Sequence, residues 1–144
     1  MPPCLDVYVW IGDPRPHMLD RFVAAYVNVD DPGFDVRVLD ELRSEGGGFT
    51  LYLRSRDHSY AIITFTDEGA LVLGLSVEDD GDLGLTSRRA GELLDVLRAE
   101  FSAAAGLAGV ELPPPRSRAE WDDDGMVLLR VGAPPSVGED PVGR

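Results

Sequence analysis

The chain has 144 residues, the length of one typical domain, and its 44% hydrophobic residues are enough to form a core. It contains 26 Asp and Glu against 13 Lys and Arg, which gives a formal net charge of −13 at pH 7. The lack of a basic run argues against direct nucleic-acid binding, and the lack of an apolar run of about 18 residues argues against a transmembrane helix.

The first predicted strand covers residues 5–11, where two kinds of side chain alternate with the period of a half-buried strand. A proline-containing break then precedes a predicted helix over residues 16–28, whose apolar side chains repeat every three to four positions. The aliphatic face of the strand carries Leu5, Val7, Val9 and Ile11. Its other face carries Asp6, Tyr8 and Trp10.

The middle of the chain predicts mainly strands. Residues 34–38 alternate and predict a short strand, and residues 39–45 predict a helical turn. Three β-rich runs follow, at residues 49–54, 60–66 and 71–77. Because the loops between these three runs are short, the runs should pair as antiparallel hairpins and form a meander.

A second amphipathic helix is predicted to begin near Thr86 or Ser87, either of which has a hydroxyl that can cap it. Gly106 suits the position just beyond the end of this helix. Leu94 lies at the centre of the apolar face and should therefore be a core residue.

The C-terminal region predicts an extended segment, a strand and a tail. Pro113–Pro115 must be extended, and residues 126–131 predict the last strand. Residues 133–144 are rich in proline, glycine and charge, and we expect a disordered tail there.

These elements predict an α+β fold, with an antiparallel-dominated sheet, a β-meander, and two amphipathic helices packed on one face. Residues 1–132 should form a single domain. Two helices can cover only one face of such a sheet, so the other face should be available for binding.

No motif in the sequence predicts catalysis, a metal ion or a cofactor. The acidic loop at residues 78–82 lacks the oxygen ligands and the glutamate of a calcium loop at the required spacing. His17 and His58 are too far apart to form a two-histidine zinc motif. Residues 46–48 lack the Lys and Ser/Thr of a phosphate loop, and residues 74–78 lack the second glycine of a nucleophile elbow. We therefore expect a protein that is not an enzyme.

Two features favour binding to another protein. Tyr8 and Trp10 fall on the face of the first strand that the helices should leave open, and Tyr52 falls on the polar side of its own strand. Tyr and Trp are frequent anchors of protein interfaces. The alternative is that the segment containing Trp121 covers these aromatic side chains.

The second feature is the grouping of acidic residues in predicted loops, where they create local negative potential that speeds association with a cationic surface. The candidate partner-binding acids are Asp67, Glu68, Glu78, Asp79, Asp80 and Asp82. An ordinary charged surface is the alternative. All basic residues are arginine, and lysine and glutamine are absent, which is typical of a GC-rich bacterial genome and accounts for part of the acidity.

In size, charge and expected architecture the chain resembles bacterial immunity proteins, which bind a cognate polymorphic toxin and block its active site. The resemblance implies a basic toxin enzyme as partner, often one that acts on nucleic acid, and occlusion by acidic loops around an aromatic anchor. An N-terminus without signal-peptide features and a single cysteine, Cys4, agree with a cytoplasmic protein.

Two other functions remain open. One is a small-molecule-binding or regulatory domain with a pocket between the helices and the sheet. The other is an enzyme built on His17 or His58 with nearby carboxylates, which a histidine of perturbed pKa in a cleft would favour.

Overall fold

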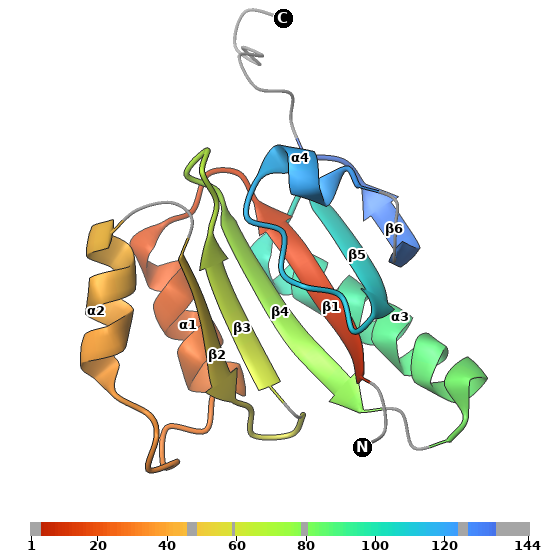
Figure 1. Cartoon of the computed structure of the whole chain (residues 1–144), viewed down its shortest axis with the longest axis horizontal. Coiled ribbons are helices and arrows are strands. Elements are labelled where there is room, and N and C mark those ends of the chain that lie inside the picture. The colour runs from red at the N-terminus through yellow and green to blue at the C-terminus, as the bar shows by residue number, and fades with distance from the viewer. Residues whose placement is uncertain (1–3, 46–48, 59, 79–80, 124–126, 135–144) are drawn as a thin grey trace, which may run out of the picture.

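The computed structural model describes residues 4–45, 49–58, 60–78, 81–123 and 127–134 (Figure 1). Within these residues the strands form a single six-stranded sheet. The strands are β1 (Cys4–Ile11), β2 (Phe49–Arg54), β3 (Tyr60–Phe65), β4 (Leu71–Glu78), β5 (Ala105–Val110) and β6 (Val127–Gly132). The helices are α1 (Pro16–Tyr26), α2 (Val36–Glu45), α3 (Leu83–Phe101) and α4 (Arg118–Trp121).

The strand order across the sheet is β2-β3-β4-β1-β5-β6, and every neighbouring pair is antiparallel. The predicted meander is confirmed as β2-β3-β4. The N-terminal strand β1 lies between β4 and β5, so it is hydrogen-bonded on both sides. The chain is thus an α+β fold with an antiparallel sheet, as its sequence predicts.

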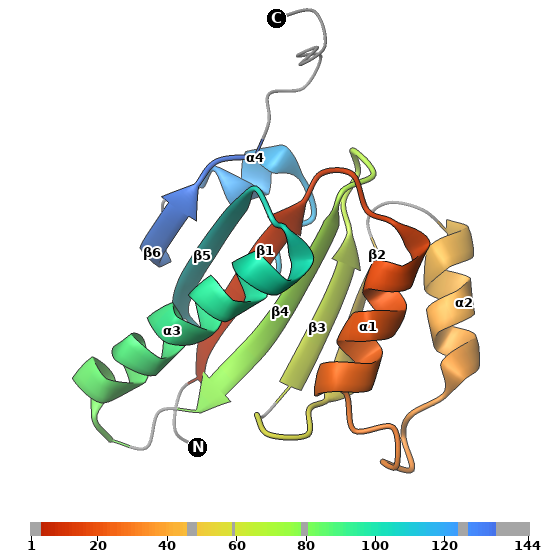
Figure 2. The same ribbon diagram turned by 180° about the vertical axis from the view of Figure 1, so that it is seen from behind.

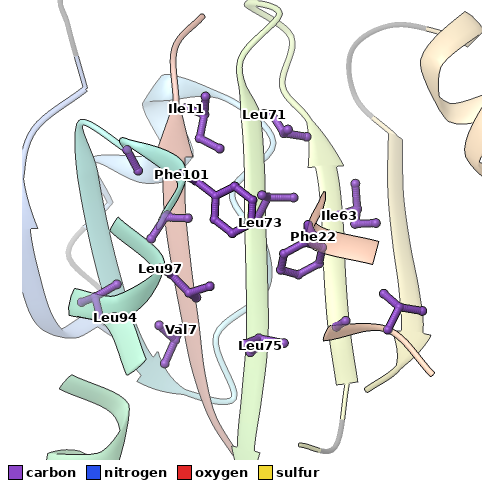
Figure 3. Close-up of a cluster of buried hydrophobic side chains, with 14 of the residues drawn as sticks. Val7, Ile11, Phe22, Ile63, Leu71, Leu73, Leu75, Leu94, Leu97 and Phe101 are labelled. Carbon is purple, nitrogen blue, oxygen red and sulfur yellow. The ribbon is translucent and has the colours of Figure 1, made fainter. Parts of the chain in front are cut away.

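One face of the sheet packs against α1 and α3, which both lie in front of the sheet in Figure 2. Figure 3 shows Phe22 of α1 and Phe101 of α3 over Leu73 of β4, and the two phenyl rings meet edge to face at 6.0 Å. The aliphatic side chains of β1 belong to this cluster, which confirms the alternation read from the sequence. Helix α2 lies beside the outer strand β2 and buries Leu39.

The opposite face is covered over β1 and β5 by α4 and by residues 111–117, which we call the strap (Figure 1). Backbone hydrogen bonds hold both ends of the strap. The Glu111 N–H donates to the Cys4 carbonyl at 2.8 Å, and the Asp67 N–H donates to the Arg116 carbonyl at 2.9 Å. Beneath α4, the Trp10 and Trp121 rings pack edge to face at 5.4 Å. A second, smaller core therefore lies on this face.

Two glycines make room for large side chains on neighbouring elements. A Cβ at Gly74 of β4 would lie 2.5 Å from Cδ1 of Tyr8, so the glycine lets the Tyr8 ring lie across β4. A Cβ at Gly106 would lie 2.5 Å from Cδ1 of Leu94, which is 1% exposed. Gly106 is thus a residue of β5 under the helix, and the prediction that it ends the helix is wrong. The helix ends earlier because Ser102 has a left-handed backbone, with φ of 52°.

Three other sequence predictions need correction. Residues 34–38 do not form a strand, because the Asp35 side chain accepts the Arg37 N–H at 2.9 Å and so caps α2. Helix α3 begins at Leu83, before the predicted hydroxyl caps, because the Asp82 side chain accepts the Leu85 N–H. Strand β5 was not expected, because its small residues carry little strand signal.

Of the expected tail, the structure describes only residues 133 and 134, and Pro134 is buried.

Replacing Leu94 with alanine should lower the free energy of unfolding by about 2–5 kcal/mol, because the side chain is buried between α3 and β5. Denaturant unfolding of both proteins measures the change. A loss well below about 1 kcal/mol would contradict the packing of α3 described here.

Gly74→Ala should destabilise the protein by about 1–3 kcal/mol, because the new methyl group would overlap the Tyr8 ring. The matched control is Gly91→Ala in α3, where the nearest atom, Cδ1 of Leu129, lies at an ordinary 3.7 Å. The control should raise stability by up to about 1 kcal/mol, since alanine favours helix over glycine. Equal thermal midpoints for the two variants would show that the Tyr8 ring does not lie over Gly74.

Candidate functional site

The sequence placed Tyr8 and Trp10 on an open sheet face, and the structure corrects this expectation. Both side chains point to the predicted face, but they are only 0% and 4% exposed, because the strap and Trp121 cover them. The Tyr8 hydroxyl donates to the Leu112 carbonyl at 2.5 Å and so helps to hold the strap. These two residues cannot meet a partner while the strap is in place.

The part of this face that the strap leaves open carries an exposed group of Tyr52, Arg54 and Tyr60, which we call the tyrosine surface. Tyr52 is 58% exposed and Tyr60 39% exposed. The guanidinium carbon of Arg54 lies 5.2 Å from the centre of the Tyr60 ring, and the two residues are directly paired between β2 and β3. Tyr52 was predicted as a binding residue, whereas Arg54 and Tyr60 were missed. Alternation along β2 indicates Arg54, but Tyr60 is found only once the register with β3 is known.

Three concavities meet at the tyrosine surface. The largest, about 860 Å³, lies at the end of the sheet near the β2–β3 loop. We call it the end cleft. Among the described residues its charged lining is balanced, with Arg54, Arg56, Arg89, Asp31, Asp57 and Glu78. A second, of about 250 Å³, runs beside Phe34 toward α2. The third, of about 310 Å³, lies between the tyrosines and the strap, and we call it the strap groove.

The floor of the strap groove contains the buried carboxyl group of Asp6, which is 8% exposed. Burial raises the pKa of Asp6 to about 6, while hydrogen bonds from the Ser76 hydroxyl and the Leu112 backbone oppose the rise, and the nearby Glu111 charge adds to it. Burial and the Asp6 charge also raise the pKa of Tyr52. Asp6 is therefore an acid that changes its charge near neutral pH beside exposed tyrosines.

The four predicted acidic binding residues that the structure describes do not form one surface. Asp67 and Glu68 lie before β4, whereas Glu78 and Asp82 lie at and beyond its other end. Glu68 has a structural contact, since its carboxylate accepts the Arg118 N–H at 3.1 Å. Asp82 caps α3. Asp79 and Asp80 fall outside the described residues.

The two histidines considered for catalysis lie in different surroundings. His58 lines the end cleft, and burial lowers its pKa, although the Asp57 charge opposes that effect. His17 is exposed on α1 and does not line the end cleft. Over the described ranges, no group of three or more His, Cys, Asp and Glu residues is arranged to hold a metal ion.

The chain matches no protein-family model, no curated protein and no solved structure. Among the helices that the structure describes, none has the length and apolar character needed to span a membrane.

The pKa of Asp6 leads to a pH-dependent stability. Because the folded pKa of about 6 exceeds the ordinary aspartate value of 3.8, the folded state holds this proton more tightly than the unfolded state. The stability that this proton provides is present at low pH and is lost as the pH rises through 6. The stability of the native protein relative to Asp6→Asn should therefore fall by about 1–3 kcal/mol between pH 4 and pH 7. Urea unfolding of both proteins at both pH values measures this difference in stability. A difference that does not change with pH would contradict the raised pKa of Asp6.

Proposed function

We propose that the chain is an immunity-type protein that binds a basic toxin enzyme and occludes it, with the tyrosine surface as the centre of the contact. The observation that carries this proposal is the exposed group of Tyr52, Arg54 and Tyr60 on a sheet face that the strap covers only in part. Tyr and Arg, together with Trp, are the residue types enriched among those that supply most of the binding energy of a protein interface.

The net charge of −13 supports a basic partner. A field of this sign steers a cationic protein toward the chain and raises the association rate, even where the acids do not touch the partner. The distribution of the acids at both ends of the sheet suits this long-range role better than a single acidic contact.

A second candidate function is binding of a small anionic molecule in the end cleft. Its volume of about 860 Å³ lies within the range of small-molecule sites, and three arginines line it. The acids in the same lining weaken this reading, because Asp31, Asp57 and Glu78 balance the arginine charge. An anionic ligand would raise the thermal midpoint at millimolar concentration, and an Arg56→Ala variant would lose that effect.

The immunity proposal is tested with a partner captured from the producing cells, whose toxicity the chain must suppress when the two are co-expressed. Tyr52→Ala should increase the dissociation rate, by a loss of about 2 kcal/mol for a central anchor. The side chain is exposed, so the thermal midpoint of this variant should stay close to that of the native protein.

Association should slow steeply as the ionic strength rises from about 0.01 M to 0.15 M, because the Debye length falls from about 30 Å to 8 Å. Asp57→Arg, beside the tyrosine surface, should slow association more than Glu92→Arg on α3, which changes the net charge equally on another element. Association rates that do not change with salt would overturn the proposal. A Tyr52→Ala variant that still suppresses the toxicity fully and dissociates at the native rate would also overturn it.

A further inference from the structure

We propose that the strap groove receives an arginine side chain of the basic partner. This inference rests on the proposed function, since it names the chemical group that the tyrosine surface would recognise. The groove has a floor of Asp6, Ile62 and Ser76. Tyr52 and Tyr60 border it on the side of β2 and β3, and the strap borders it on the other side.

Among the described residues, the charged side chains that line the strap groove have one sign. Asp6 and Glu111 are its charged lining residues, and no cationic side chain lines it within the described part of the chain. This differs from the end cleft, where arginines balance the acids. The two carboxylates already act on each other, because the Glu111 charge helps to raise the pKa of Asp6. A cation in the groove would relieve this repulsion and favour the charged form of Asp6.

The aromatic lining also suits a cation. A guanidinium group binds over the face of a tyrosine ring through the quadrupole of the ring. The chain itself contains such a contact, since Arg54 lies over Tyr60 at 5.2 Å. Tyr52, more exposed than Tyr60, stands two residue pairs further along the same two strands and therefore on the same face. It supplies an accessible ring beside the two carboxylates.

The size of the groove favours a side chain over a larger ligand. Its volume of about 310 Å³ lies at the lower end of the range for small-molecule sites. Arginine fits this combination better than lysine, because its planar group can stack on a ring and donate two parallel hydrogen bonds to one carboxylate. The strap's own Arg116 acts on the Tyr52 hydroxyl through its charge but does not line the groove.

The test uses the full chain and small probes, so it needs no partner protein. N-acetyl-arginine methylamide is titrated into the labelled protein, and backbone and side-chain NMR shifts are followed. The matched control is the citrulline analogue, which has nearly the same shape without the charge. We expect saturable shifts at Ile62, Ser76 and Leu112 with the arginine probe, and none with the citrulline probe.

Two variants locate the binding site. Glu111→Gln should weaken the arginine probe about threefold, the effect of one partly solvated ion pair. Tyr52→Ala should weaken it by a similar factor through the lost ring contact. The control Glu92→Gln removes the same charge from an exposed position on α3 and should leave the affinity unchanged.

Equal responses to the arginine and citrulline probes would overturn the inference. Shifts confined to the end cleft around Asp57 and His58, or equal weakening by Glu111→Gln and Glu92→Gln, would also overturn it, because either result indicates only general attraction to an acidic protein. The outcome is separate from that of the proposed function. If a toxin binds with undiminished affinity to Glu111→Gln and the arginine probe does not bind, the function stands and this inference fails.

Discussion

Strand β1 is the element on which the rest of the structure depends, because both of its edges and both of its faces are in use. Its backbone is hydrogen-bonded to β4 on one side and to β5 on the other. Its aliphatic side chains enter the core under α1 and α3, and Tyr8 and Trp10 enter the smaller core under the strap. A shift of register by one residue would exchange these two sets and lose both cores.

The strap determines which part of the second face can bind. It closes over Tyr8 and Trp10, and it stops short of β2 and β3, where Tyr52 and Tyr60 remain exposed. The boundary between covered and open sheet is the strap groove, and the buried Asp6 lies there. A buried carboxyl group, hydrogen-bonded by the Ser76 hydroxyl, thus lies at the edge of the proposed binding surface.

Periodicity in the sequence predicts several features that depend on neighbours along the chain, although the alternation of residues 34–38 predicts a strand where α2 begins. The alternation of β1, the meander, and the core position of Leu94 all follow from periodicity. Features that depend on distant segments do not. The small residues of β5 are explained only by the helix above them, since Gly106 leaves room for Leu94. The burial of Tyr8 and Trp10 depends on a strap about 100 residues further along the chain, as the separation of 104 between Tyr8 and Leu112 illustrates.

The packing of Trp10 against Trp121 also decides what can be learned from the fluorescence of this protein. The chain has two tryptophans, and both lie in the core beneath α4, with their rings 5.4 Å apart. Tryptophan emission therefore reports on the docking of α4 and the strap, and it carries little information on the packing of α1 and α3. The helical signal in circular dichroism comes mainly from α1, α2 and α3, which are much longer than α4. A comparison of the two signals during unfolding shows directly whether the strap leaves the sheet before the helices do.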